Sequence, residues 1–64
     1  MKNKELKNIA TKVAEYEWII QTSEDKKSIR EAEENIMELS KKVHSLEDMM
    51  AIDELVMEML AKKF

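Results

Sequence analysis

The first third of the chain carries apolar side chains at alternating spacings of three and four residues. The residues of this seam are Leu6, Ile9, Val13, Tyr16 and Ile20. Because an α-helix turns once about every 3.6 residues, this spacing places the seam on one face and predicts a helix over about 4–21. Trp18 and Ile19 lie on opposite sides of the seam and widen the apolar face. A helix with so broad an apolar face is expected to pack against two neighbours.

A polar segment, Thr22 to Asp25, separates this series from a second one. The second series consists of Ile29, Ala32, Ile36, Leu39 and Val43. It predicts a second helix over about 25–43. Thr22 and Asp25 have the spacing of a capping box at a helix start. Ser28, with Glu31 three residues later, gives a second possible start.

Two interpretations remain open for the chain after residue 43. Lysines precede this point, acids follow it, and Ser45 to Asp48 has the spacing of a capping box. This pattern favours a break at His44-Ser45 and a third helix over about 46–63. The alternative is a helical hairpin whose long second helix, about 28–63, forms an oligomeric coiled coil. That alternative places Asp53 in an apolar seam, where an unpaired charge is costly.

The last third of the chain is the most apolar part and holds four of the six methionines. On a helix its apolar side chains cover more surface than one neighbour can bury. Surface of this kind usually marks an interface, and Trp is favoured at interfaces. The residues predicted to form an interface are Trp18, Ile19, Met49, Met50, Ile52, Leu55, Val56, Met57, Met59, Leu60 and Phe64.

Composition supports an all-helical fold. The 64 residues include no Gly and no Pro, the residues on which tight turns and hairpins depend and which weaken helix interiors. The sequence therefore predicts one all-α domain over residues 1–64, a small three-helix bundle with up-down-up topology.

The small size of the chain favours self-association. A core of this size rarely supplies more than about 3–5 kcal/mol, and small domains usually add disulfides, a metal or a partner chain. With no Cys and one His, neither a disulfide nor a thiolate metal site is available. We therefore expect a homodimer or a higher homo-oligomer.

Several classes of function are disfavoured by the residues present. No catalytic, cofactor-binding or metal site is predicted, because His44 lacks further ligands and the hydroxyl residues lack a second His for a triad. The net charge of −3 argues against nucleic-acid binding, which needs a concentrated basic face. No apolar run reaches the length of a membrane span, and residues 1–8 do not resemble a signal peptide. The expected location is cytoplasmic.

The sequence thus predicts a small, acidic, non-enzymatic protein-protein interaction or regulatory module that self-associates through apolar helix faces. An alternative is a chaperone-like or adaptor subunit that docks one heterologous protein on the Met-rich last helix, because Met adapts to irregular contacts. A nucleic-acid-binding regulator is a third and less favoured alternative.

Overall fold

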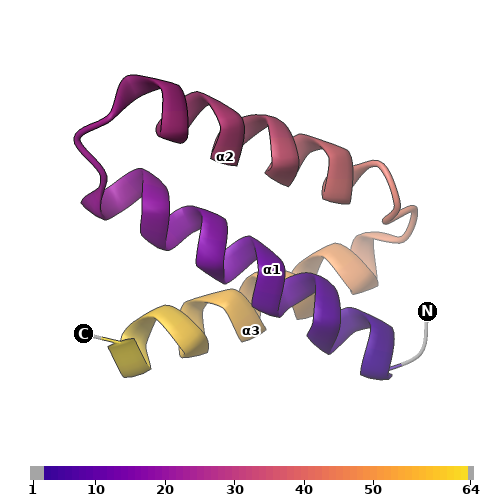
Figure 1. Cartoon of the computed structure of the whole chain (residues 1–64). Helices are drawn as coiled ribbons and strands as arrows, with labels where there is room; N and C mark the ends of the chain where they lie inside the picture. Colours follow the sequence, from indigo (N-terminus) through magenta and orange to yellow (C-terminus); the bar gives the residue numbers. More distant parts are fainter. Residues whose placement is uncertain (1–2, 64) are drawn as a thin grey trace.

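Three α-helices make up the chain. A computed structural model describes residues 3–63, and its helices are α1 (Asn3–Thr22), α2 (Lys26–Ser40) and α3 (Leu46–Lys63). They run up, down and up, so that α1 and α3 are roughly parallel (Figure 1). The described part contains no strand. The predicted all-α three-helix bundle is confirmed.

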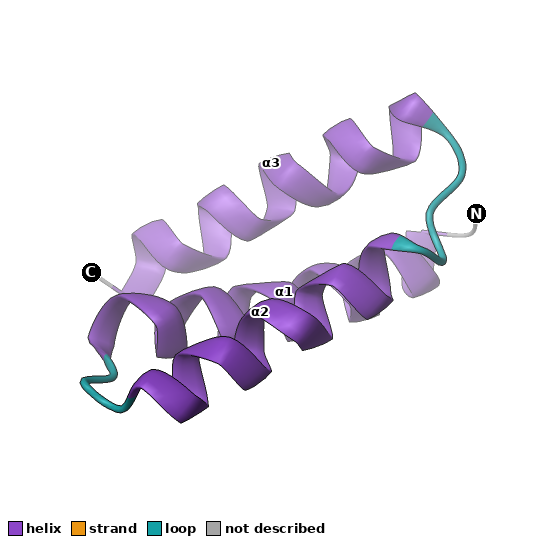
Figure 2. Cartoon of the chain, turned by 90° about the horizontal axis from the view of Figure 1, so that it is seen from above, coloured by secondary structure: helices purple, strands orange, loops and turns teal. Residues whose placement is uncertain are grey.

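Helix α1 lies in the middle of the molecule. Both α2 and α3 pack against α1, but within residues 3–63 they make no contact with each other. Figures 1 and 2 show α2 and α3 on different sides of α1. The Cα atoms extend 34 × 25 × 16 Å, as expected for helices arranged side by side. The broad apolar face of α1 therefore has two neighbours, but those neighbours do not close around it.

The connection between α1 and α2 ends at Asp25, which caps the start of α2. Its carboxylate accepts a hydrogen bond from the backbone N–H of Lys27 at 3.1 Å and another from the Ser28 hydroxyl at 2.9 Å. Because the first N–H groups of a helix have no intrahelical partner, a carboxylate here stabilises the start. The cap predicted at Thr22 is wrong. Thr22 ends α1 instead, and its hydroxyl donates to the Trp18 carbonyl at 2.7 Å.

The second turn separates α2 from α3, so the alternative of one long second helix is wrong. The N–H groups of Lys42 and Val43 donate to carbonyls three residues earlier, at 3.1 Å each. Such bonds tighten the last turn of a helix and end it. The Ser45 carbonyl accepts from the N–H of Met49 at 3.0 Å, which is the first intrahelical bond of α3. The chain thus reverses direction between residues 41 and 45.

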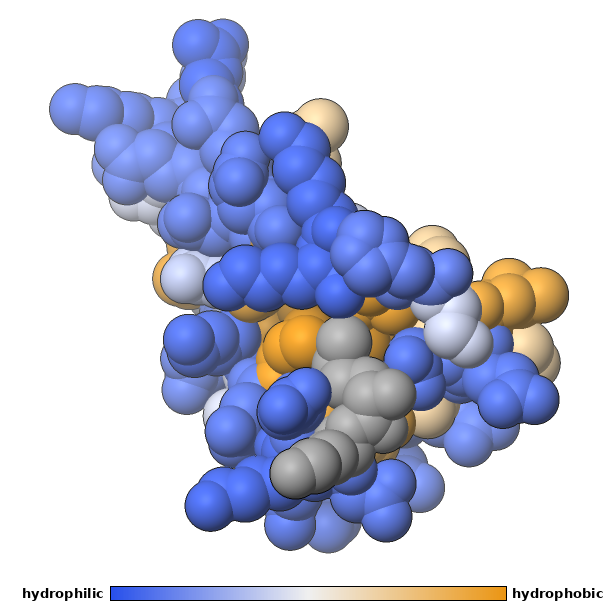
Figure 3. Space-filling view, turned by 90° about the vertical axis from the view of Figure 1, so that its right-hand side faces the viewer, coloured by the Kyte–Doolittle hydropathy of each residue, from blue (hydrophilic) through white to orange (hydrophobic). Residues whose placement is uncertain are grey.

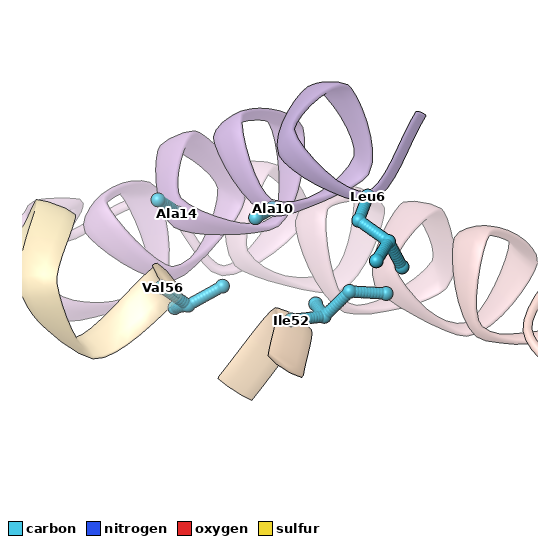
Figure 4. Packing of buried hydrophobic residues seen from close by; sticks show 5 residues of the cluster. All are labelled: Leu6, Ala10, Ala14, Ile52 and Val56. Carbon is cyan, nitrogen blue, oxygen red and sulfur yellow. The ribbon is translucent and has the colours of Figure 1, made fainter. Parts of the chain in front are cut away.

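The core lies between α1 and α3. Its buried members are Leu6, Ala10, Ala14, Ile52 and Val56. Figure 4 shows Leu6, Ala10 and Ala14 along one side of α1, facing the two α3 residues. Ala10 is completely buried, because the small side chains let the helix backbones approach closely. Beyond Leu6, the large members of the predicted seam, Ile9, Val13, Tyr16 and Ile20, are half-buried. Ile9 and Val13 pack against the core.

A smaller contact joins α1 and α2. Ala32 and Leu39 are the buried residues of α2, and Val43 in the following turn packs against the main core. These residues belong to the predicted apolar series of the second helix. Met37, two residues before Leu39, is 63% exposed. The apolar stripe of α2 is therefore narrow, and the rest of the helix faces water.

Candidate interaction surface

One flank of α3, next to the side that meets α1, carries exposed apolar side chains. They are Leu46 at 72%, Met49 at 48%, Met50 at 58% and Met57 at 71% exposure. We call these four residues the α3 stripe. Residues three, four or seven positions apart share one side of a helix, so the members of the stripe are neighbours in space. Leu46, Met49 and Met50 lie within about one turn of each other, and Met57 lies about two turns farther along the same flank.

The position of α3 explains why the stripe is uncovered. Helix α3 forms one edge of the molecule (Figure 2) and contacts α1 but not α2. Ile52 and Val56 occupy the side that meets α1. The stripe lies on the neighbouring flank of α3, since Met49 is three residues before Ile52, and no second helix of the described chain contacts α3 there. Burial against α1 uses only part of the apolar surface of α3.

Asp53 lies within the stripe and is exposed. It comes four residues after Met49 and four before Met57, which places it on the same side of α3. In the chain as described, the carboxylate reaches water and requires no buried partner. Its presence in an apolar surface becomes costly only if another molecule covers that surface.

The other residues predicted at an interface have different positions. Ile52 and Val56 are buried at 6% and 8% exposure and form the intramolecular core. Leu55, Met59 and Leu60 are half-buried and pack against that core.

Two further predicted residues lie on α1, and one lies at the end of the chain. Trp18 is half-buried and Ile19 is exposed. Phe64 lies outside the described residues. Leu46, the most exposed member of the stripe, is absent from the predicted set. Leu46 lies four residues before Met50, and this helical spacing could have predicted that it belongs to the same side of α3.

A second apolar surface lies on α1 between its two neighbours. Leu6, Ala10 and Ala14 face α3, whereas Tyr16 and Ser23 line a hollow together with α2. By helical spacing, Ile9, Val13 and Ile20 fall between these two sides, and all three are half-buried. Figure 3 shows hydrophobic side chains reaching the surface below the hydrophilic layer at the top of the view. The apolar surface of this chain is thus wider than the α3 stripe.

Two hollows lie on the described surface beside α1. One, of about 370 Å³, lies between α1 and α2 and is lined by residues such as Tyr16, Ser28 and Glu31. The other, of about 400 Å³, lies between α1 and α3 beside Lys7, Glu54 and Glu58. Within residues 3–63, no group of His, Asp and Glu side chains is arranged to hold a metal ion.

Charge is distributed unevenly along α3. Glu47 and Asp48 lie in its first turn, and the lysines Lys62 and Lys63 lie at its end. Acids near a helix start and bases near its end both interact favourably with the helix dipole. As a result, the stripe runs from an acidic end to a basic end of the helix.

Comparison with protein-family models, with curated proteins and with solved structures finds no match to this chain. Of the helices in the described part, none combines the length and the apolar character needed to span a bilayer. The candidate site is therefore defined by its physical properties: an exposed apolar stripe on the edge helix of an open three-helix bundle.

Proposed function

We propose that this chain is a small, non-enzymatic protein-protein interaction module that self-associates through its apolar helix surfaces, and that it acts in the cytoplasm. The observation that carries the proposal is the exposure of Leu46, Met49, Met50 and Met57 on one side of α3. Isolated apolar residues are common on protein surfaces, but contiguous apolar patches usually mark interaction sites. A second polypeptide on this side would remove the stripe from water.

Stability supports the same proposal. Among the described residues, seven apolar side chains are buried, and three of them are alanines. Burial of an apolar side chain as large as Val or Leu contributes about 1.5–3 kcal/mol, and Ala contributes less because it has less area. A core of this composition gains stability from any binding that is specific for the folded state, since such binding shifts the equilibrium away from the unfolded chain.

Light scattering coupled to size-exclusion chromatography tests the proposal. We expect the apparent mass to rise from one chain towards two over about 10 µM to 1 mM, the range expected for a small, weak interface. Met57→Glu should weaken the association at least about tenfold, because it places a charge in the stripe.

Met37→Glu is the matched control. Met37 is also an exposed methionine, at 63%, but it lies on α2 outside the stripe. The control should associate as the wild-type chain does. A wild-type chain that stays monomeric at about 1 mM, the upper end of that range, contradicts self-association. In that case, stoichiometric capture of one other protein, lost in Met57→Glu but retained in Met37→Glu, would support the adaptor alternative.

A further inference from the structure

We infer that a second copy of this chain docks on the α3 stripe, with the two α3 helices antiparallel and related by a two-fold axis near Asp53. This inference rests on the proposed self-association and specifies its geometry. It depends on the order of apolar and charged residues along α3 and on the position of α3 at an edge of the molecule.

The apolar residues are distributed on both sides of Asp53. Leu46 precedes it by seven residues and half-buried Leu60 follows it by seven, whereas Met49 and Met57 are each four residues away. When two such helices are antiparallel and cross at Asp53, Leu46 of one copy lies opposite Leu60 of the other. Met49 likewise lies opposite Met57. Apart from Asp53 at the axis, these apolar side chains therefore meet apolar side chains, in the reciprocal pairs that a two-fold symmetric interface requires.

Charge decides between the two relative directions. A parallel pair places the acidic first turns, with Glu47 and Asp48, beside each other, and it also places the two helix ends that carry Lys62 together. An antiparallel pair places the acidic end of each helix near the basic end of the other. Opposite charges attract across such a contact and like charges repel. In the antiparallel pair, the partly positive N-terminus of each helix also lies near the partly negative C-terminus of the other, which is favourable.

The fold leaves room for this arrangement. Helix α3 is at the edge of the molecule, α1 covers its inner side, and α2 does not contact it (Figure 1). The described chain thus covers only the side of α3 that meets α1, and the stripe stays exposed. The contact is about 27 Å long, since α3 has 18 residues and each rises about 1.5 Å. One helix pair of this length gives a small interface, so the association is weak and depends on concentration.

Disulfide trapping distinguishes the two directions, because the chain has no cysteine of its own. Met50→Cys and Met57→Cys are suitable positions, since both methionines are exposed and lie outside the core. One variant is uniformly labelled with ¹⁵N, the two are mixed, and a mild copper oxidant is added. Mass spectrometry then separates mixed dimers from dimers of either variant alone. Met37→Cys, another exposed methionine position but on α2, reports cross-linking by random collision.

The antiparallel pair predicts at least fivefold more mixed Met50→Cys/Met57→Cys dimer than dimer of either variant alone. In that pair, two copies of residue 50 are offset by about 10 Å along the helices, whereas a disulfide needs Cα atoms about 4.4–6.8 Å apart. A predominance of dimers of one variant overturns the inference and indicates a parallel pair.

Sedimentation equilibrium of the wild-type chain separates the inference from the proposed function. Association without mixed cross-links above the Met37→Cys level overturns the antiparallel α3 pair and leaves self-association standing. A monomeric wild-type chain with no cross-linking above that level overturns both.

Discussion

Leu6 of α1 and Ile52 of α3 point toward each other across the contact between these helices (Figure 4). Both are buried, at 8% and 6% exposure, and they belong to one cluster with Ala10, Ala14 and Val56. Since α2 makes no contact with α3, this cluster fixes the position of α3. The orientation of the α3 stripe depends on the same cluster.

Ala10→Leu should destabilise the fold. Ala10 has no exposed surface, so a larger side chain must push α1 and α3 apart or adopt a strained conformation, at a cost of about 1–3 kcal/mol. Urea unfolding followed by circular dichroism at 222 nm measures the change. Ala61→Leu, at an exposed position of α3, is the control and should stay within about 0.5 kcal/mol of the wild-type chain. An unchanged midpoint in Ala10→Leu would contradict close packing of α1 against α3.

Leu39→Ala should detach α2 from α1. Leu39 is a large buried side chain in that contact, and truncation of a buried Leu costs about 2–5 kcal/mol. Such a loss is comparable with the whole stability expected of a small core, about 3–5 kcal/mol. Fluorescence of Trp18, the single tryptophan, can follow unfolding. The neighbouring Met37→Ala substitution removes an exposed side chain and should cost less than about 0.5 kcal/mol; equal losses in the two variants would rule out this assignment of the contact.

Asp25→Ala should lower stability by about 1 kcal/mol, because it removes the side chain that caps α2. The Asp25 carboxylate accepts hydrogen bonds from the Lys27 N–H and the Ser28 hydroxyl. Asp25→Asn keeps an acceptor oxygen and should retain most of the stability. Glu24→Ala, one residue earlier, removes an equal charge in the same turn without removing the cap. Thermal unfolding of the three variants distinguishes capping from a general effect of charge.

Asp53→Asn should strengthen self-association about three- to tenfold. In the antiparallel pair, the two Asp53 carboxylates approach the two-fold axis within an apolar contact, where like charges repel and desolvation is unfavourable. Glu34→Gln removes the same charge from an exposed position of α2 and should leave the association constant unchanged. Sedimentation equilibrium at one ionic strength gives both constants. Weaker association in Asp53→Asn would be incompatible with a pair centred on this residue.

Many features of the fold follow from local sequence. The absence of Gly and Pro and the spacing of apolar residues predict an all-α, three-helix chain, because helix formation depends on residues within one or two turns of each other. Local sequence does not determine the start of α2. Thr22, Asp25 and Ser28 are all common at helix starts, and only the backbone conformation shows which side chain reaches the free N–H groups. Asp25 does so in the structure.

The sequence alone determined where the helices lie and that α1 and α3 have more apolar surface than one neighbour buries. Tertiary structure decided which part of that surface became the core. The alanines Ala10 and Ala14 face α3, while Ile9, Val13 and Ile20 remain half-buried. Likewise Ile52 and Val56 are buried, and Met50 and Met57 are exposed. A broad apolar face permits several directions of approach, and the choice among them depends on how closely two backbones can pack, which apolar spacing does not determine.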